Sequence, residues 1–209
     1  MGIQIDDFLN GYLKSRPLKN FYIALQKCTD CKLAALYVNK LNLNEDAGKL
    51  PGYGNCKSSM IFIAQQPAFN RKGHKVFGGD NANDNLFNKG LEHIGVERKD
   101  VFVTNLVKCS QLDNGSIGQD IIKTCVNNHL ITELRLLQPR LIIAVGSLAK
   151  NAFDAEYGES KVCNPRFQTG FSHIVAIHHP AYILRGGMKR TDYMKEFTQL
   201  KKIIKRYSL

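Results

Sequence analysis

The chain has 209 residues, of which 44% are hydrophobic and 22% are charged. These proportions exclude a disordered chain, and the length suits one compact domain over residues 1–209. The formal net charge of +11 at pH 7 favours a polyanionic partner such as nucleic acid. A soluble basic protein without such a partner has the same charge balance, so charge alone leaves both alternatives open.

The N-terminal sequence predicts a cytoplasmic protein. Asp6 and Asp7 interrupt the stretch where a signal peptide is apolar, and no run approaches the roughly 18 apolar residues that span a bilayer. We therefore expect no membrane association, and we expect a monomer. Six cysteines in a reducing compartment indicate metal ligation or catalysis before disulfide bonds.

The predicted elements alternate between helices and short apolar strands. A helical N-terminal segment and a loop over residues 42–55 precede the first strand. Buried strands are expected at residues 60–64, 101–105, 141–145 and 174–177. Helices are expected at residues 85–94, 119–137, 147–155 and 192–207. This alternation predicts an α/β fold with a central, mainly parallel four-stranded sheet covered by helices on both faces.

Polar residues follow the ends of the predicted strands. Gln65 and Gln66 follow the first strand, Asn105 ends the second, Ser147 lies after the third, and His179 lies after the fourth. Ligands bind beyond the carboxyl ends of the strands in sheets of this kind. We therefore expect the functional site at that edge.

Four cysteines have a spacing that suits a metal centre. They are Cys28, Cys31, Cys109 and Cys125. Four soft thiolates suit zinc or an iron–sulfur cluster, and spacing alone does not separate these two or exclude a redox pair. The other two cysteines, Cys56 and Cys163, have no partner spacing and are interpreted as structural.

Residues 103–109 read Val-Thr-Asn-Leu-Val-Lys-Cys. This segment resembles the Thr-Asn-x-Val-Lys-Cys motif of family 4 uracil-DNA glycosylases, which carry a [4Fe–4S] cluster. Residues 139–149 and 179–185 also match that family, and the likeness runs from about residue 28 to residue 185. The resemblance implies the three-layer α/β/α sandwich of the uracil-DNA glycosylase fold, with the cluster held by the four cysteines named above.

The resemblance further implies a DNA glycosylase that flips a base out of single- or double-stranded DNA and hydrolyses its N-glycosidic bond. It places Asn105 and Gln66 at the base edge and the ring of Phe77 on the base face. His179 matches the histidine that would donate a hydrogen bond to the base O2 as negative charge grows there. His178, its neighbour, is expected to point away.

The same matches imply three contacts with the DNA itself. Ser147, with Gly146, is expected to bind a phosphate through backbone N–H groups. Leu184 or Ile183 is expected to fill the gap in the stack, and Arg185 to meet a phosphate.

The first family motif, Gly-Glu-x-Pro-Gly, is altered in this chain. Residues 64–68 read Ala-Gln-Gln-Pro-Ala, so Gln65 replaces the glutamate that is taken to activate the attacking water. An amide cannot accept a proton, but it can orient a water. Asp80 or Asp84 is a candidate for a displaced carboxylate, unless the stretch simply caps the next helix.

Three hypotheses follow from these patterns. The first is a glycosylase that acts on uracil or on a bulkier, modified pyrimidine. The second is a weak or inactive DNA-binding module that keeps the fold and the cluster. The third is a regulatory protein that binds zinc.

Overall fold

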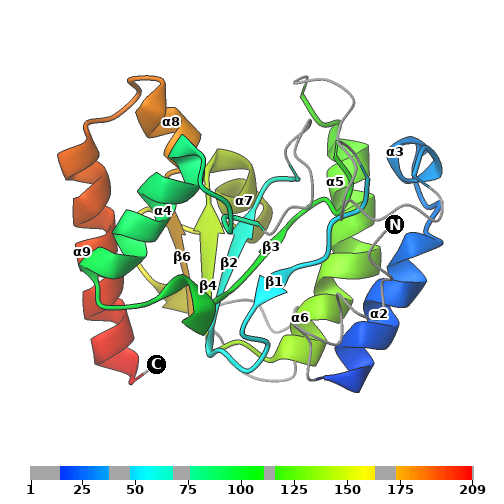
Figure 1. The fold of residues 1–209 in the computed structure, drawn as a ribbon, viewed down its shortest axis with the longest axis horizontal. Helices are drawn as coiled ribbons and strands as arrows, with labels where there is room; N and C mark the ends of the chain where they lie inside the picture. The colour runs from blue at the N-terminus through cyan, green and yellow to red at the C-terminus, as the bar shows by residue number, and fades with distance from the viewer. Residues whose placement is uncertain (1–14, 38–47, 68–75, 111–115, 163–172, 209) are drawn as a thin grey trace.

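The computed structural model describes residues 15–37, 48–67, 76–110, 116–162 and 173–208 (Figure 1). A six-stranded sheet with the order β1-β3-β2-β4-β6-β5 forms its centre. The strands are β1 (Tyr53–Gly54), β2 (Met60–Ala64), β3 (Phe102–Asn105), β4 (Leu141–Val145), β5 (Lys161–Val162) and β6 (His173–Ile177). The four central strands are the predicted ones, to within one residue at each end.

These four central strands run parallel to one another. Ile61 pairs with Phe102 on one side of β2 and with Ile142 on the other, and Ile142 pairs in turn with Ile174. The edge strands β1 and β5 run antiparallel to their neighbours. The sequence predicts a four-stranded sheet and misses these two edge strands. Each has only two residues, which is too short to leave a hydrophobic pattern.

The described helices are α2 (Arg16–Gln26), α3 (Lys32–Ala35), α4 (Ala82–His93), α5 (Gln119–Cys125), α6 (Ile131–Leu137), α7 (Ser147–Phe153), α8 (Pro180–Leu184) and α9 (Arg190–Tyr207). A π-helical turn, η2 (Val126–Leu130), joins α5 to α6. The predicted helix over residues 119–137 is therefore confirmed in extent but contains this turn, which begins directly after Cys125. π-helical turns are often found at functional sites.

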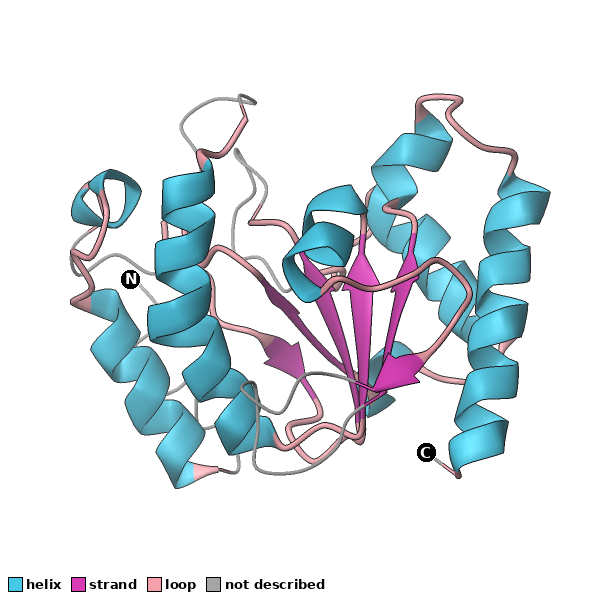
Figure 2. Ribbon diagram, turned by 180° about the vertical axis from the view of Figure 1, so that it is seen from behind, coloured by secondary structure: helices cyan, strands magenta, loops and turns pink. Residues whose placement is uncertain are grey.

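The helices cover both faces of the sheet, as Figures 1 and 2 show. Successive strand residues alternate between two cores: Ile61 and Ile63 pack with α2, α5, α6 and α7, whereas Phe62 and Ala64 pack with α4, α8 and α9. Both cores are therefore lined by the same strands. The three-layer α/β/α sandwich is confirmed. None of the described helices is both long and apolar enough to cross a membrane.

Helix α4 begins three residues earlier than expected. Asn81 caps it: its side-chain oxygen accepts hydrogen bonds from the N–H groups of Asn83 at 3.0 Å and Asp84 at 3.2 Å. This satisfies backbone donors that would otherwise be unpaired in the first turn. The expectation that the Asn-rich stretch caps the next helix is thus confirmed.

Candidate active site and cysteine cavity

Four central strands end at one edge of the sheet, the upper edge in Figure 1. Asn105 ends β3 beside Ala64, the last residue of β2, and Gln65 follows Ala64. Gly146 follows β4, and His179 lies just beyond β6. The structure thus brings these predicted site residues to the same edge of the sheet.

The side chain of Asn105 is buried but has no hydrogen-bond partner. The residue is 1% exposed, and neither Nδ2 nor Oδ1 bonds to another group in the described part of the chain. Leaving such a group unpaired costs about 1–3 kcal/mol. The Nδ2 donor and the Oδ1 acceptor of this amide are therefore available to a ligand that offers one acceptor and one donor.

Phe77 lies close to this edge in an unusual conformation. Its φ angle is +49°, in the left-handed region that residues other than glycine rarely adopt. Its ring stacks on Phe87 with centroids 4.4 Å apart and an angle of 18° between the planes. The ring of His179 lies 5.5 Å from it. One face of Phe77 is thus covered by Phe87, and the ring also adjoins the histidine.

His179 is held in one tautomer by the start of α8. The backbone N–H of Ala181 donates a hydrogen bond of 3.1 Å to its Nδ1. A nitrogen that accepts cannot carry the proton, so in the neutral ring the proton lies on Nε2. Gly146 has a φ of +89°, and a Cβ there would come within 3.1 Å of the His179 Cβ. Glycine therefore lets the chain after β4 approach His179 closely.

His178 points to a different environment from His179, as expected. Its Nδ1 lies 2.5 Å from Oε1 of Glu196 on α9. Its ring stacks between Tyr157, at 3.9 Å, and Tyr182, at 5.2 Å. His178 therefore joins β6, α8 and α9, and its ring is engaged by structural partners.

The altered first motif lies directly after β2. Gln65 and Gln66 are both partly buried. The carbonyl of Gln65 accepts a hydrogen bond of 3.0 Å from Val107, which ties this turn to the segment after β3. Of the two acidic candidates, Asp80 is exposed, whereas Asp84 is buried and accepts a hydrogen bond of 2.8 Å from the N–H of Gly79.

The predicted DNA contacts surround the same edge. Ser147 is exposed at the start of α7, and Arg185 is exposed at the end of α8. Leu184 is partly buried, whereas Ile183 is 4% exposed within the core. Of the two expected wedge residues, Leu184 is therefore the one with accessible surface.

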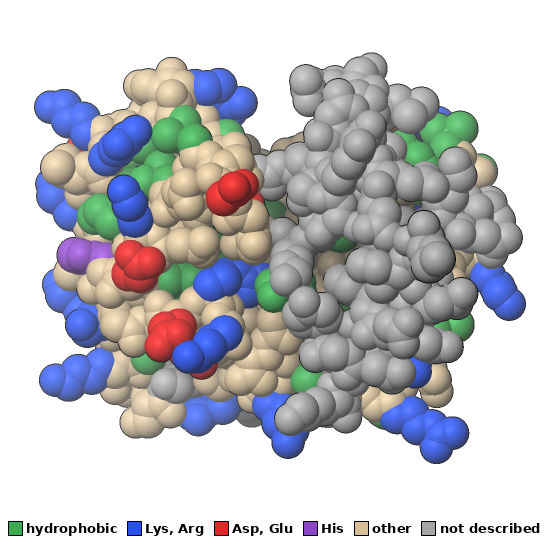
Figure 3. Space-filling view, in the orientation of Figure 1, with side chains coloured by type: hydrophobic (Ala, Val, Ile, Leu, Met, Phe, Trp, Pro, Cys, Tyr) green, Lys and Arg blue, Asp and Glu red, His purple; other side chains and the backbone are tan. Residues whose placement is uncertain are grey.

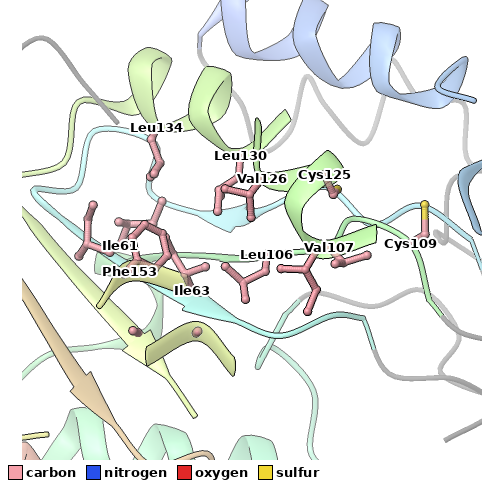
Figure 4. Close-up of a cluster of buried hydrophobic side chains, with 14 of the residues drawn as sticks. Ile61, Ile63, Leu106, Val107, Cys109, Cys125, Val126, Leu130, Leu134 and Phe153 are labelled. Carbon is pink, nitrogen blue, oxygen red and sulfur yellow. The ribbon is translucent and has the colours of Figure 1, made fainter. Parts of the chain in front are cut away.

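All four predicted cysteine ligands line one small cavity, together with Asp30, Lys108 and His129. Figure 4 shows Cys109 and Cys125 at one end of the hydrophobic core. Nε2 of His129, in the π-helical turn, lies 3.0 Å from Sγ of Cys28 and 3.2 Å from Oδ2 of Asp30. Cys56 is partly buried against the core, and Cys163 lies outside the described residues.

Burial in the cavity favours the neutral form of its cysteine and histidine side chains. Burial raises the pKa of Cys125 to about 11, and it raises the pKa of Cys109 further. Burial also lowers the pKa of His129. These thiols therefore stay protonated at neutral pH unless a metal offsets their desolvation.

The spacing of the ligand atoms distinguishes the two kinds of metal centre. Among the described side chains, only Cys28, Asp30 and His129 bring three ligand atoms within 4.8 Å of one another. A single tetrahedral zinc ion with Zn–S bonds of about 2.3 Å draws its sulfur ligands to within about 4 Å. No three of the four described sulfur atoms lie within 4.8 Å of one another, so they are not arranged as the ligands of one zinc ion are.

A buried polar network connects this cavity to the strand that carries Asn105. The backbone N–H of Lys108 donates to Sγ of Cys125 at 3.4 Å. Its Nζ donates to Oγ1 of Thr104 at 2.6 Å and forms a short ion pair with Glu133, which also accepts from Tyr22. Lys108 and Glu133 are fully buried. The sequence does not point to this network, because its members lie far apart along the chain.

Basic side chains are spread over the surface. In Figure 3, Lys and Arg lie around the upper, left and lower margins of the described part of this face, with acidic groups toward its middle. On the described part of this face, the basic side chains are therefore dispersed and do not form one patch.

Comparison with known proteins agrees with this geometry. Residues 51–201 match the family model of the uracil DNA glycosylase superfamily. The chain belongs to this superfamily. Membership assigns it to the DNA glycosylase class of hydrolases, and the expected fold is the superfamily's fold.

Within the superfamily, the chain is similar to curated type-4 uracil-DNA glycosylases. It is 26% identical to the enzyme of Archaeoglobus fulgidus over 84% of this chain and 89% of the relative. It is 26% identical to the enzyme of Thermotoga maritima over 87% of this chain and 92% of the relative. A type-5 uracil-DNA glycosylase of Pyrobaculum aerophilum is 29% identical over 49% of this chain and 51% of the relative.

Proposed function

We propose that the protein flips a uracil or a modified pyrimidine out of DNA and hydrolyses its N-glycosidic bond, leaving an abasic site. The observation that carries this proposal is the buried, unpartnered amide of Asn105 at the carboxyl edge of the sheet. A protein keeps such a costly group where a ligand satisfies it. The amide complements the N3–H donor and O4 acceptor of uracil.

Two rings complete the base site. Phe77, backed by Phe87, stacks on the extruded base, a contact worth about 1–3 kcal/mol. His179 donates a hydrogen bond from its Nε2–H group to the base O2, because its Nδ1 already accepts one from the N–H of Ala181. The N1–C1′ bond breaks with its electron pair on the base, and a neutral imidazole at O2 stabilises that negative charge as it develops.

No carboxylate is present to activate the attacking water at residue 65, where the family motif has a glutamate. Gln65 orients this water by hydrogen bonding, and Gln66 lies beside it at the base. Water adds to C1′ and its proton passes to the departing base or to solvent, so no proton has to rest on Gln65. Asp80, exposed before α4, is the candidate for a displaced carboxylate. Catalysis then depends chiefly on the charge stabilisation at the leaving base.

The DNA contacts and the cysteine cavity support this site from two sides. Ser147 and Arg185 contact phosphates, and Leu184 fills the space that the flipped base leaves. The four cysteines hold a [4Fe–4S] cluster, which their number, thiolate chemistry and spacing suit better than zinc. The cluster's role is structural: it ties the N-terminal helices to β3 and α5. The protein acts as a monomer.

A second candidate function rests on Gln65. Loss of the motif glutamate favours a DNA-binding module that keeps the fold and the cluster but turns over weakly or not at all.

Excision on defined oligonucleotides tests both functions. Single- and double-stranded oligonucleotides that carry uracil or a modified pyrimidine are incubated with the protein and cleaved with alkali. The proposed glycosylase leaves an alkali-labile site at one of these bases. Retarded oligonucleotides without alkali-labile sites would overturn the proposal in favour of the binding module. Broad absorbance near 400 nm, with about four iron and four sulfide ions per chain, is expected from the cluster.

A further inference from the structure

The guanidinium group of Arg98 donates hydrogen bonds to backbone carbonyls of three segments. Nε donates to the carbonyl of Phe77 at 3.1 Å, and Nη2 donates to the carbonyl of Val76 at 2.5 Å. Nη2 also reaches the carbonyl of Tyr53 at 3.3 Å, and Nη1 reaches that of Val101 at 3.3 Å. Arg98 therefore joins the start of the Phe77 turn to β1 and to the residue before β3.

These contacts fall where the backbone is strained. Phe77 has a φ of +49°, and such a conformation is strained and persists only where the surroundings enforce it. Two of the four carbonyls bound by Arg98 belong to Phe77 and to Val76 before it. The arginine thus acts directly on the two peptide units that set the direction of the Phe77 ring.

A carboxylate holds the same turn from its other end. Asp84 is 1% exposed, and its Oδ2 accepts a hydrogen bond of 2.8 Å from the N–H of Gly79. Arg98 binds the carbonyl groups of residues 76 and 77, and Asp84 binds the N–H group of residue 79. Burial lowers the pKa of Arg98 to about 10, which still leaves it charged at neutral pH. The turn is therefore fixed between opposite charges.

We propose that Arg98 is a positioning residue for base binding, which holds the Phe77 ring in its stacking orientation before DNA arrives. This inference rests on the proposed stacking role of Phe77. If the ring is ordered before the base arrives, the binding step does not lose the conformational entropy of ordering it. Lysine cannot replace the arginine here, because a single ammonium group does not span four carbonyls in a planar fork.

A double-mutant cycle tests the inference. The variants are Arg98→Met, Phe77→Ala and their combination, with Arg135→Met on the exposed side of α6 as the matched control. The probe is a duplex that carries 2′-fluoro-2′-deoxyuridine, which resists hydrolysis. The readout is the ratio of its affinity to that of the same duplex with thymidine, which cancels any general loss of DNA binding.

We expect Arg98→Met and Phe77→Ala each to lower this ratio about tenfold, the order of one lost base–aromatic stack. We expect the double variant to lose no more than either single variant, because both remove the same contact. Arg135→Met is expected to leave the ratio unchanged. Arg98→Lys keeps the charge, and we expect it to lower the ratio several-fold. This variant provides the test if Arg98→Met is insoluble.

Two results would overturn the inference in distinguishable ways. A normal ratio for the soluble Arg98 variants, beside a reduced ratio for Phe77→Ala, would show that Arg98 does not position the Phe77 ring. The proposed function would remain intact. A normal ratio for Phe77→Ala would remove the stacking role itself, and the inference with it.

Discussion

The Nζ of Lys108 donates a hydrogen bond of 2.9 Å to the backbone carbonyl of Asn105. The same lysine donates its backbone N–H to Sγ of Cys125 and pairs with Glu133. One buried residue therefore contacts both the strand end that carries the amide proposed to read the base and a wall of the cysteine cavity. The stability of this network bears on both sites.

We predict that Glu133→Gln destabilises the protein by about 3–5 kcal/mol, because it leaves the Lys108 cation buried without its counter-charge. Urea denaturation followed by circular dichroism measures the change. Replacing both residues with methionine is expected to cost less than Glu133→Gln alone. A double variant that is less stable than the single variant would contradict this account of the pair.

Asn105→Leu is predicted to separate stability from activity. The buried amide has no partner among the residues that the structure describes, so an apolar side chain of similar size is expected to leave the melting temperature unchanged or to raise it. Excision is expected to fall about a hundredfold or more, since a hydrogen-bonding group at the reacting base is lost. Thermal denaturation and single-turnover excision on one preparation measure both. A clear loss of stability would show that Asn105 is structural.

His179→Ala is predicted to lower single-turnover excision about a hundredfold while leaving DNA affinity nearly unchanged, because its Nε2 proton acts mainly as charge develops on the base. His93→Ala, on the exposed surface of α4, is the matched control. An unchanged excision rate in His179→Ala would remove this histidine from the mechanism.

Gln65→Glu is predicted to raise the rate at uracil, since a carboxylate there can accept the proton of the water; general-base catalysis of this kind contributes about 10²–10⁴-fold. Asp80→Asn is the companion variant. An unchanged rate for Gln65→Glu, beside a large loss for Asp80→Asn, would mean that Asp80 already supplies the base and that Gln65 does not limit the reaction.

Cys109→Ala is predicted to lower the soluble yield and to abolish the absorbance of the proposed cluster, without changing which base is removed. The cavity lies between α2, the segment after β3 and α5, so losing the proposed occupant is expected to release the N-terminal helices from the sheet. Cys56→Ala, outside the cavity, is expected to keep the yield and the absorbance. A Cys109→Ala protein with normal stability would show that the cluster is not structural.

The sequence predicts the central fold well because hydrophobic patterns report burial. The strands at residues 60–64 and 141–145 have the predicted bounds, since continuous apolar runs mark strands buried on both faces. Strands β1 and β5 are missed because two residues that pair at an edge carry no such pattern. The π-helical turn after Cys125 is missed because the apolar spacing over residues 119–137 remains helical.

The positions of candidate site residues are predictable where a motif follows a strand, and Asn105 and His179 lie at the expected edge of the sheet. Residues that act through tertiary contacts are not predictable in this way. Nothing in the local sequence distinguishes Arg98 from the other basic residues, and its four carbonyl partners come from three segments of the chain. Glu133 and Tyr22 are missed for the same reason.

The most direct test of the central claim is single-turnover cleavage of a uracil-containing oligonucleotide by the wild-type protein beside Asn105→Leu, scored after alkali. A modified pyrimidine in the same position serves as the second substrate. We predict an alkali-labile site at one of these bases with the wild-type protein and a loss of about a hundredfold or more with Asn105→Leu. Absence of cleavage at every base, with DNA still bound, would contradict the assignment of a working glycosylase.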